Sequence, residues 1–186
     1  MELVPQDVID AIAKCSAEVQ RIQSQTDNAL VGIRAEFRER IEVLFEKRQE
    51  QLGKVDGFWS EAFTAPESPV RSLLCGPLDQ RLARALTDFN VKTSIREGTI
   101  CRCVMVTFRS NICVEEGTYS RELDSTLKTI SVKPIVWKNG TERTRHDSVF
   151  KFFSTDETNE EFIEDVLAAF DELFQNPFLV LEAETE

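Results

Sequence analysis

Apolar and polar positions alternate along residues 5–52 in the pattern of one long amphipathic helix. Pro5 suits a first helical turn, and Gly53 suits the position that follows the last turn. Between them, apolar or small residues alternate at steps of four and three as far as Ile33, which is the heptad spacing of a coiled-coil seam, and a stutter of 4-4-3 follows through Leu44. These seam positions are Val8, Ile12, Cys15, Val19, Ile22, Thr26, Ala29, Ile33, Phe37, Ile41 and Leu44.

A helix of this length cannot bury its seam against the rest of a 186-residue chain. At about 1.5 Å per residue it would extend roughly 70 Å, about twice the diameter of a small domain. A second copy of the helix is the simplest partner, so we expect a homodimer. The predicted dimer interface consists of Ile12, Val19, Ile22, Ala29, Ile33, Phe37, Ile41 and Leu44.

After the long helix, the pattern changes to that of a compact α+β domain. A short helix is expected from Ser68–Pro69 to Gly76, and another after Pro77. Alternating apolar positions then predict four strands with short connections, which favour an antiparallel sheet. These strands are expected at 89–95, 100–108, 119–123 and 130–137, with a bend in the last one at Pro134. We therefore expect an α+β fold, with a dimerisation helix at 1–53 and a sheet with packed helices at 54–186.

The last predicted helix has a sharply divided surface. It follows Thr158, which has capping-box spacing to Glu161, and ends at Asn176–Pro177. Its apolar residues fall on one arc of about 140°, and acidic residues fill the opposite arc. Those acidic residues are Glu160, Glu161, Glu164, Asp165, Asp171 and Glu172. One face should join the core, and the other should offer carboxylates to a cationic partner.

The net charge of −11 is concentrated at the C-terminal end of the chain. Residues 148–186 contain eleven acidic residues and a single basic one, Lys151, for a charge of −10. Such a field repels nucleic acid and membrane phosphates and attracts basic partners. The alternative is that the acidic residues only keep the domain soluble.

The residue types that usually support catalysis or metal binding are sparse. The single histidine, His146, is better explained as a solvated loop residue than as a catalyst. Cys101, Cys103 and Cys113 lack the paired spacing of a structural zinc site, so buried thiols are the better interpretation. No glycine-rich phosphate loop or nucleophile motif occurs. We therefore expect no enzymatic activity, no metal and no cofactor.

Two further features bear on location and partners. No apolar run is long enough for a membrane helix, and the N-terminus lacks the basic and then apolar pattern of a signal peptide. A small basic cluster, formed by Lys138, Arg143, Arg145 and His146, follows a predicted turn at Asn139–Gly140. It could contact DNA phosphates or an import receptor, but a solvated hairpin end is the favoured interpretation. No membrane contact and no strong nucleic-acid binding are expected.

Several short motifs, in this order, resemble the NAP/SET family of nucleosome assembly proteins, and its SET-like branch in particular. Each is weak alone, but their order and spacing are distinctive. They are Phe58-Trp59 with Phe63, Val70 to Leu74, Ile135-Val136-Trp137-Lys138-Asn139-Gly140, Phe150 to Phe153 with Ser154-Thr155-Asp156, and Asn176-Pro177.

This resemblance implies a homodimer of long antiparallel helices, with an earmuff-like α+β domain on each copy. It implies a nuclear histone chaperone, present also in the cytoplasm if it shuttles, that shields core histones from non-specific DNA contact and promotes nucleosome assembly. A dimeric scaffold or regulatory adapter, such as a phosphatase inhibitor or acetyltransferase cofactor, is the alternative. The implied histone-binding residues are Asp156, Glu157, Glu160, Glu161, Glu164, Asp165, Asp171, Glu172, Glu115 and Glu116.

Overall fold

The computed structural model describes residues 5–96, 99–138 and 148–178. The chain divides into two compact units, residues 1–41 and residues 42–186. Helix α1 (Gln6–Leu52) confirms the predicted long helix, and its last turns belong to the second unit. The predicted dimerisation role of residues 1–53 remains a prediction.

In the first unit, the helical residues 6–41 expose the predicted seam. Four large apolar side chains are about half exposed: Ile12 (59%), Ile22 (51%), Ile33 (53%) and Phe37 (54%). Exposed ion pairs such as Arg21–Glu18 lie on the same segment and contribute little to its stability. The predicted seam is therefore an exposed apolar strip along this part of the helix.

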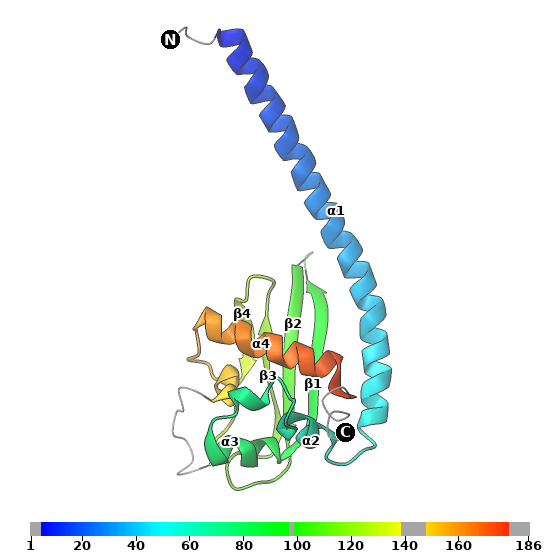
Figure 1. The fold of residues 1–186 in the computed structure, drawn as a ribbon, viewed down its shortest axis with the longest axis vertical. Helices are drawn as coiled ribbons and strands as arrows, with labels where there is room; N and C mark the ends of the chain where they lie inside the picture. The colour runs from blue at the N-terminus through cyan, green and yellow to red at the C-terminus, as the bar shows by residue number, and fades with distance from the viewer. Residues whose placement is uncertain (1–4, 97–98, 139–147, 179–186) are drawn as a thin grey trace. The chain divides into compact units, whose positions relative to one another are not determined.

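The second unit contains a four-stranded antiparallel sheet in the order β1-β2-β3-β4, as predicted. Its strands are β1 (Leu86–Arg96), β2 (Thr99–Phe108), β3 (Gly117–Leu123) and β4 (Thr129–Lys133) (Figure 1). The regular ladder of the fourth strand ends at Lys133, where the sequence predicts a bend at Pro134. Pro134 follows Lys133 directly and has no N–H to continue the ladder, and Trp137 instead pairs with Val114 in an isolated bridge.

Short helices precede and follow the sheet. They are α2 (Phe58–Thr64), η1 (Arg71–Leu73), α3 (Gly76–Ala83), η2 (Val149–Phe153) and α4 (Glu160–Gln175). The helix predicted from Ser68–Pro69 to Gly76 is wrong in extent. Only the 3₁₀ turn η1 forms there, with the Arg71 N–H donating to the Ser68 carbonyl in an i→i+3 bond of 3.0 Å.

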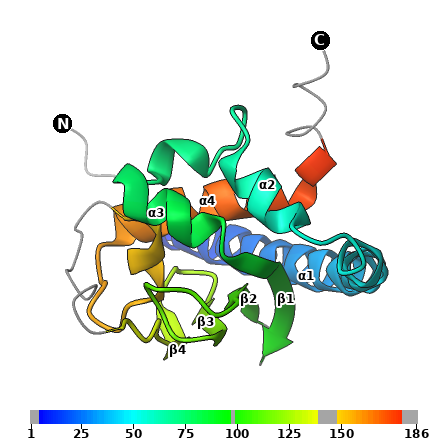
Figure 2. The ribbon, with the colours of Figure 1, turned by 90° about the horizontal axis from the view of Figure 1, so that it is seen from below.

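One face of the sheet is covered by helices, and aromatic rings fill the space between them. Helices α2, α3 and α4 lie on the same side of the sheet (Figure 2). Phe89 of β1 is fully buried and lies at the centre of this layer. Its ring centroid lies 4.9 Å from that of Phe63 in α2, and 5.4 Å from that of Phe170 in α4. Contacts of this kind stabilise a core by about 0.5–1.5 kcal/mol beyond simple burial.

The N-terminus of α4 is capped by Asn159. Its side-chain oxygen accepts hydrogen bonds from the Glu161 N–H at 3.1 Å and the Phe162 N–H at 3.4 Å. The predicted capping box on Thr158 is therefore wrong by one position. The predicted end of the helix at Asn176 is confirmed, since Asn176 is its C-cap residue.

Replacing the cap tests this assignment. Asn159→Ala removes the acceptor for two N–H groups and should lower the free energy of unfolding by about 1 kcal/mol, measured by urea denaturation at fixed protein concentration. Thr158→Ala, the matched control at the predicted cap, should change it by less than about 0.5 kcal/mol. A larger loss of stability from Thr158→Ala than from Asn159→Ala would identify Thr158 as the cap instead.

Candidate functional site

Helix α4 presents a continuous row of exposed carboxylates, which we call the α4 acidic face. It consists of Glu160, Glu161, Glu164, Asp165 and Glu172, all of them exposed. The opposite side of the same helix is buried, and includes Ile163, Val166 and Phe170. Because the apolar side is held against the core, the acidic side must face solvent.

Nothing in the described part of the chain neutralises this face. None of its five carboxylates forms an ion pair with a described lysine or arginine, and the last turn of α4 has no basic residue. Glu160 and Glu164 are four residues apart, as are Glu161 and Asp165, so like charges adjoin along the helix. Each such pair costs about 0.2–0.5 kcal/mol. A cationic partner would remove that repulsion.

Asp171 differs from the other acidic residues of α4. Its carboxylate is half-buried and accepts a hydrogen bond from Arg102 of β2, whose guanidinium also donates to the Thr93 hydroxyl. This contact explains why a charged residue interrupts the apolar pattern of β2. Asp171 therefore holds α4 on the sheet, and we leave it out of the acidic face.

Glu157 is a structural residue in this fold. It is only 3% exposed, and its carboxylate lies 2.7 Å from the Lys151 ammonium and accepts from the Asn159 N–H at 2.8 Å. Burial acts to raise the pKa of Glu157, but the hydrogen bonds and the charge of Lys151 outweigh it and bring that pKa below its ordinary value. A partner cannot reach this carboxylate in the described conformation.

The other predicted acidic residues lie outside α4. Asp156 is exposed just before the helix and accepts a hydrogen bond from the Ser154 hydroxyl. Glu115 and Glu116 are exposed before the first residue of β3. Glu160 borders the opposite end of that strand, in a hollow that also contains Arg121 and Thr129. At about 3.3 Å per residue, β3 separates the two places by roughly 20 Å.

Two further features of the described residues concern metal ions and membranes. In residues 5–96, 99–138 and 148–178 there is no group of His, Cys, Asp and Glu that could hold a metal ion. No helix in these ranges is long and apolar enough to cross a membrane. Cys101 is buried and Cys103 half-buried, in keeping with structural thiols.

Of the predicted basic cluster, only Lys138 belongs to the described residues. The Lys138 ammonium donates to the Asn111 carbonyl at 2.7 Å. Arg143, Arg145, His146 and the turn at Asn139–Gly140 lie outside the described residues.

The structural role of Glu157 can be tested through pH. Since its pKa is lower in the folded state, its charge contributes stability above the unfolded pKa of about 4.3, and that contribution disappears as pH falls through the folded pKa. Glu157→Gln should therefore lower the free energy of unfolding by about 2 kcal/mol at neutral pH, and by progressively less below about pH 4. The exposed control Glu160→Gln should show little effect at either pH. A Glu157→Gln penalty that does not diminish in acid would contradict the assignment.

No protein-family model matches the chain. Solved structures do resemble it over nearly its whole length. The structure of Ccp1 has a TM-score of 0.68 at 21% sequence identity, with 94% of this chain and 98% of that chain covered. A nucleosome assembly protein from Plasmodium falciparum has a TM-score of 0.67 at 16% identity, covering 95% and 97% of the two chains. Nucleosome assembly protein 1 from Plasmodium knowlesi has a TM-score of 0.64 at 14% identity, covering 95% and 92%.

These likenesses combine low sequence identity with almost complete coverage, so they describe the path of the chain rather than individual side chains. They agree with the long helix, the antiparallel sheet and the helical layer found above. The chain therefore has the α+β fold of the nucleosome assembly proteins.

Proposed function

We propose that this protein is a dimeric histone chaperone of the nucleus that binds core histones through the α4 acidic face. The observation that carries the proposal is a row of five exposed carboxylates, without ion pairs to the described residues, on a helix whose opposite side is buried in the core. Histones are strongly basic, and carboxylates on a fixed helix can occupy the positions of DNA phosphates around them. The fold supports the same proposal.

The mechanism we propose is competition rather than covalent chemistry. Carboxylates of the α4 acidic face would pair with histone lysines and arginines and so prevent non-specific contact with DNA. Each exposed pair contributes little by itself, so binding depends on several acting together and is weakened by salt. We place Asp156 at the margin of this surface, and Glu115 and Glu116 in a separate, secondary contact.

Dimerisation is the second part of the proposal. The seam in residues 6–41 exposes large apolar side chains at heptad spacing, and Leu44 extends it with 63% exposure. A second copy of the helix would bury these residues and place two acidic faces in one particle. Two linked faces hold a histone complex more tightly than one, because the second contact is intramolecular.

A scaffold or regulatory adapter is the alternative function. The same exposed seam supports it, since a coiled-coil surface can also receive another helical protein. The two functions differ in their response to salt: binding to a neutral or acidic partner that persists at high salt would favour the adapter.

Charge reversal on α4 tests the histone site. The variant changes four residues to lysine: Glu161, Glu164, Asp165 and Glu172. At about 0.5 kcal/mol for each lost pair, affinity for core histones should fall at least about 30-fold, measured by fluorescence anisotropy near physiological salt.

The matched control changes four exposed carboxylates elsewhere to lysine, with the same change in net charge: Glu50, Asp56, Glu61 and Glu67. It should retain most of the parent affinity. Equal losses in the two variants would mean that overall charge, not the α4 acidic face, governs binding.

The dimer seam has its own test. Ile22→Glu with Ile33→Glu places two charges per chain in the predicted interface, and sedimentation equilibrium should show loss of the dimer. Ser24→Glu with Asn28→Glu is the control. It adds the same charge to exposed positions on the opposite side of the helix and should leave the dimer intact. A dimer that survives the first double change would place the interface elsewhere.

A further inference from the structure

A hollow of about 550 Å³ lies between the turn that joins β3 to β4 and the start of α4. Two apolar side chains line it: Leu127 of the turn, which is half-buried, and Ile163 of α4, which is buried against the core. Glu160, the first carboxylate of the α4 acidic face, borders the same hollow. The acidic face therefore continues directly into a depression that has apolar walls.

The turn holds Leu127 in a left-handed backbone conformation, with φ at 63°. Residues other than glycine, asparagine and aspartate rarely adopt this conformation. Asp124 fixes the turn, because its Oδ1 accepts hydrogen bonds from the Thr126 N–H at 2.8 Å and from the Lys128 N–H at 3.0 Å. The wall of the hollow is thus formed before a partner arrives, and a preformed site costs less ordering on binding.

The hollow also contains a hydroxyl group that must act as a hydrogen-bond donor. The Thr129 oxygen accepts two hydrogen bonds from the buried Arg121 guanidinium, from Nε at 3.1 Å and from Nη2 at 2.5 Å. Because a hydroxyl oxygen has two lone pairs, the Thr129 O–H is left to donate. The ammonium of Lys128, which lines the same hollow, also only donates. These donors suit a ligand with acceptor groups, such as the backbone carbonyls of a peptide.

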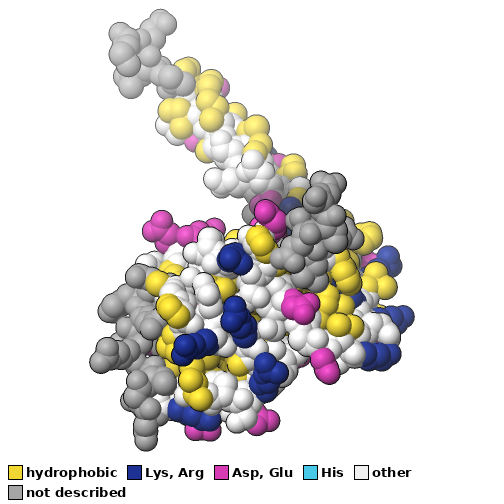
Figure 3. All heavy atoms as spheres, turned by 60° about the horizontal axis from the view of Figure 1, so that its bottom comes forward, with side chains coloured by type: hydrophobic (Ala, Val, Ile, Leu, Met, Phe, Trp, Pro, Cys, Tyr) yellow, Lys and Arg dark blue, Asp and Glu magenta, His cyan; other side chains and the backbone are white. Residues whose placement is uncertain are grey.

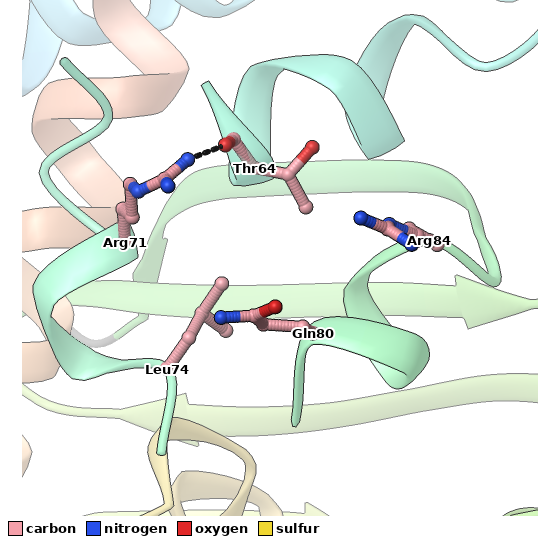
Figure 4. A pocket seen from close by; sticks show the side chains of 5 residues that line it. All are labelled: Thr64, Arg71, Leu74, Gln80 and Arg84. Atoms are coloured by element: carbon pink, nitrogen blue, oxygen red, sulfur yellow. Dashed lines mark hydrogen bonds between the residues drawn. The ribbon is translucent and has the colours of Figure 1, made fainter. Parts of the chain in front are cut away.

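The two ends of the sheet differ in charge. Arg84 lies just before β1, at the opposite end of the antiparallel strands from the β3–β4 turn. It lies with Arg71 on either side of a hollow of about 70 Å³ that no carboxylate lines (Figure 4). Figure 3 brings that end forward, and Lys and Arg side chains gather on it while Asp and Glu are sparse among them. A basic peptide is repelled there but meets Glu160 and Glu164 beside the larger hollow.

We propose that the hollow beside α4 receives an apolar side chain of a histone, next to a lysine or arginine that pairs with Glu160. This inference rests on the proposed function and adds an anchor to it. Carboxylates alone attract any polycation, whereas an apolar anchor selects a segment in which apolar and basic residues adjoin. The Thr129 hydroxyl would donate to a backbone carbonyl of that segment. Lys128 favours an acidic segment instead, but the adjoining carboxylates of α4 oppose one.

Filling the hollow tests the inference without changing any charge. Thr158 is exposed and lines the hollow, so Thr158→Phe should occupy the space. Thr155→Phe, at an exposed position of the same loop that does not line the hollow, is the matched control. Binding of refolded core-histone complexes to the full chain is measured by fluorescence anisotropy over a salt series.

Affinity of the Thr158→Phe protein should fall about tenfold, which is the effect of losing one partly buried apolar side chain. The Thr155→Phe protein should stay within about twofold of the parent. Both should keep the parent's slope of log affinity against log salt, because neither change alters a charged group.

A second measurement uses the parent protein and so does not depend on the folding of a variant. The methyl NMR signals of Leu127 and Ile163 should shift when core-histone complexes are added. Those of Leu74, which lines the hollow in Figure 4, should not shift.

Equal losses of affinity in the two phenylalanine variants would overturn the inference and leave the proposed function standing. Histone binding by the parent without shifts at Leu127 and Ile163 would have the same consequence. Shifts caused by polyglutamate and not by histones would overturn it in favour of an acidic partner. Absence of histone binding by the parent near physiological salt would overturn the proposed function itself, and this inference with it.

Discussion

The contact of the Phe89 ring with its aromatic neighbours is the interaction on which the rest of the second unit depends. Phe63 and Trp59 from α2, and Phe170 and Phe174 from α4, surround this one side chain of β1. Burial of these rings decides which side of α4 faces inward. The helical period then places the acidic residues of α4 on the opposite, exposed side. The packing of the rings therefore determines where the acidic face lies. Truncation of Phe89 would loosen the surface without removing a single charge.

Two acidic residues show why position matters more than charge. Asp171 and Glu157 belong to the same acidic segment as the exposed carboxylates, but each is held by a basic residue, Arg102 or Lys151. The first contact attaches α4 to the sheet, and the second attaches the loop before α4 to η2. The exposed carboxylates have no such attachment within the described chain and so keep their charge available to a partner. Structural and binding roles are thus divided within one short stretch of sequence.

Periodicity was sufficient to predict the long helix, the order of four antiparallel strands and the two faces of α4, because these depend on local pattern. It could not separate Glu157 from its exposed neighbours, since the Lys151 contact arises only in the folded chain. The end of β4 and the cap of α4 could not be placed from periodicity, because each depends on a single group. These groups are the missing N–H of Pro134 and the side-chain oxygen of Asn159.

The most direct test of the central claim is transfer of histones in competition with DNA. Purified protein is added to non-specific complexes of core histones with DNA over a salt series, and the DNA released is quantified. We expect release near physiological salt at stoichiometric protein, and greater release than with an unrelated protein of equal net charge. Release no greater than that of the unrelated acidic protein, or lost at modest salt, would contradict the account and leave a dimeric scaffold with another partner.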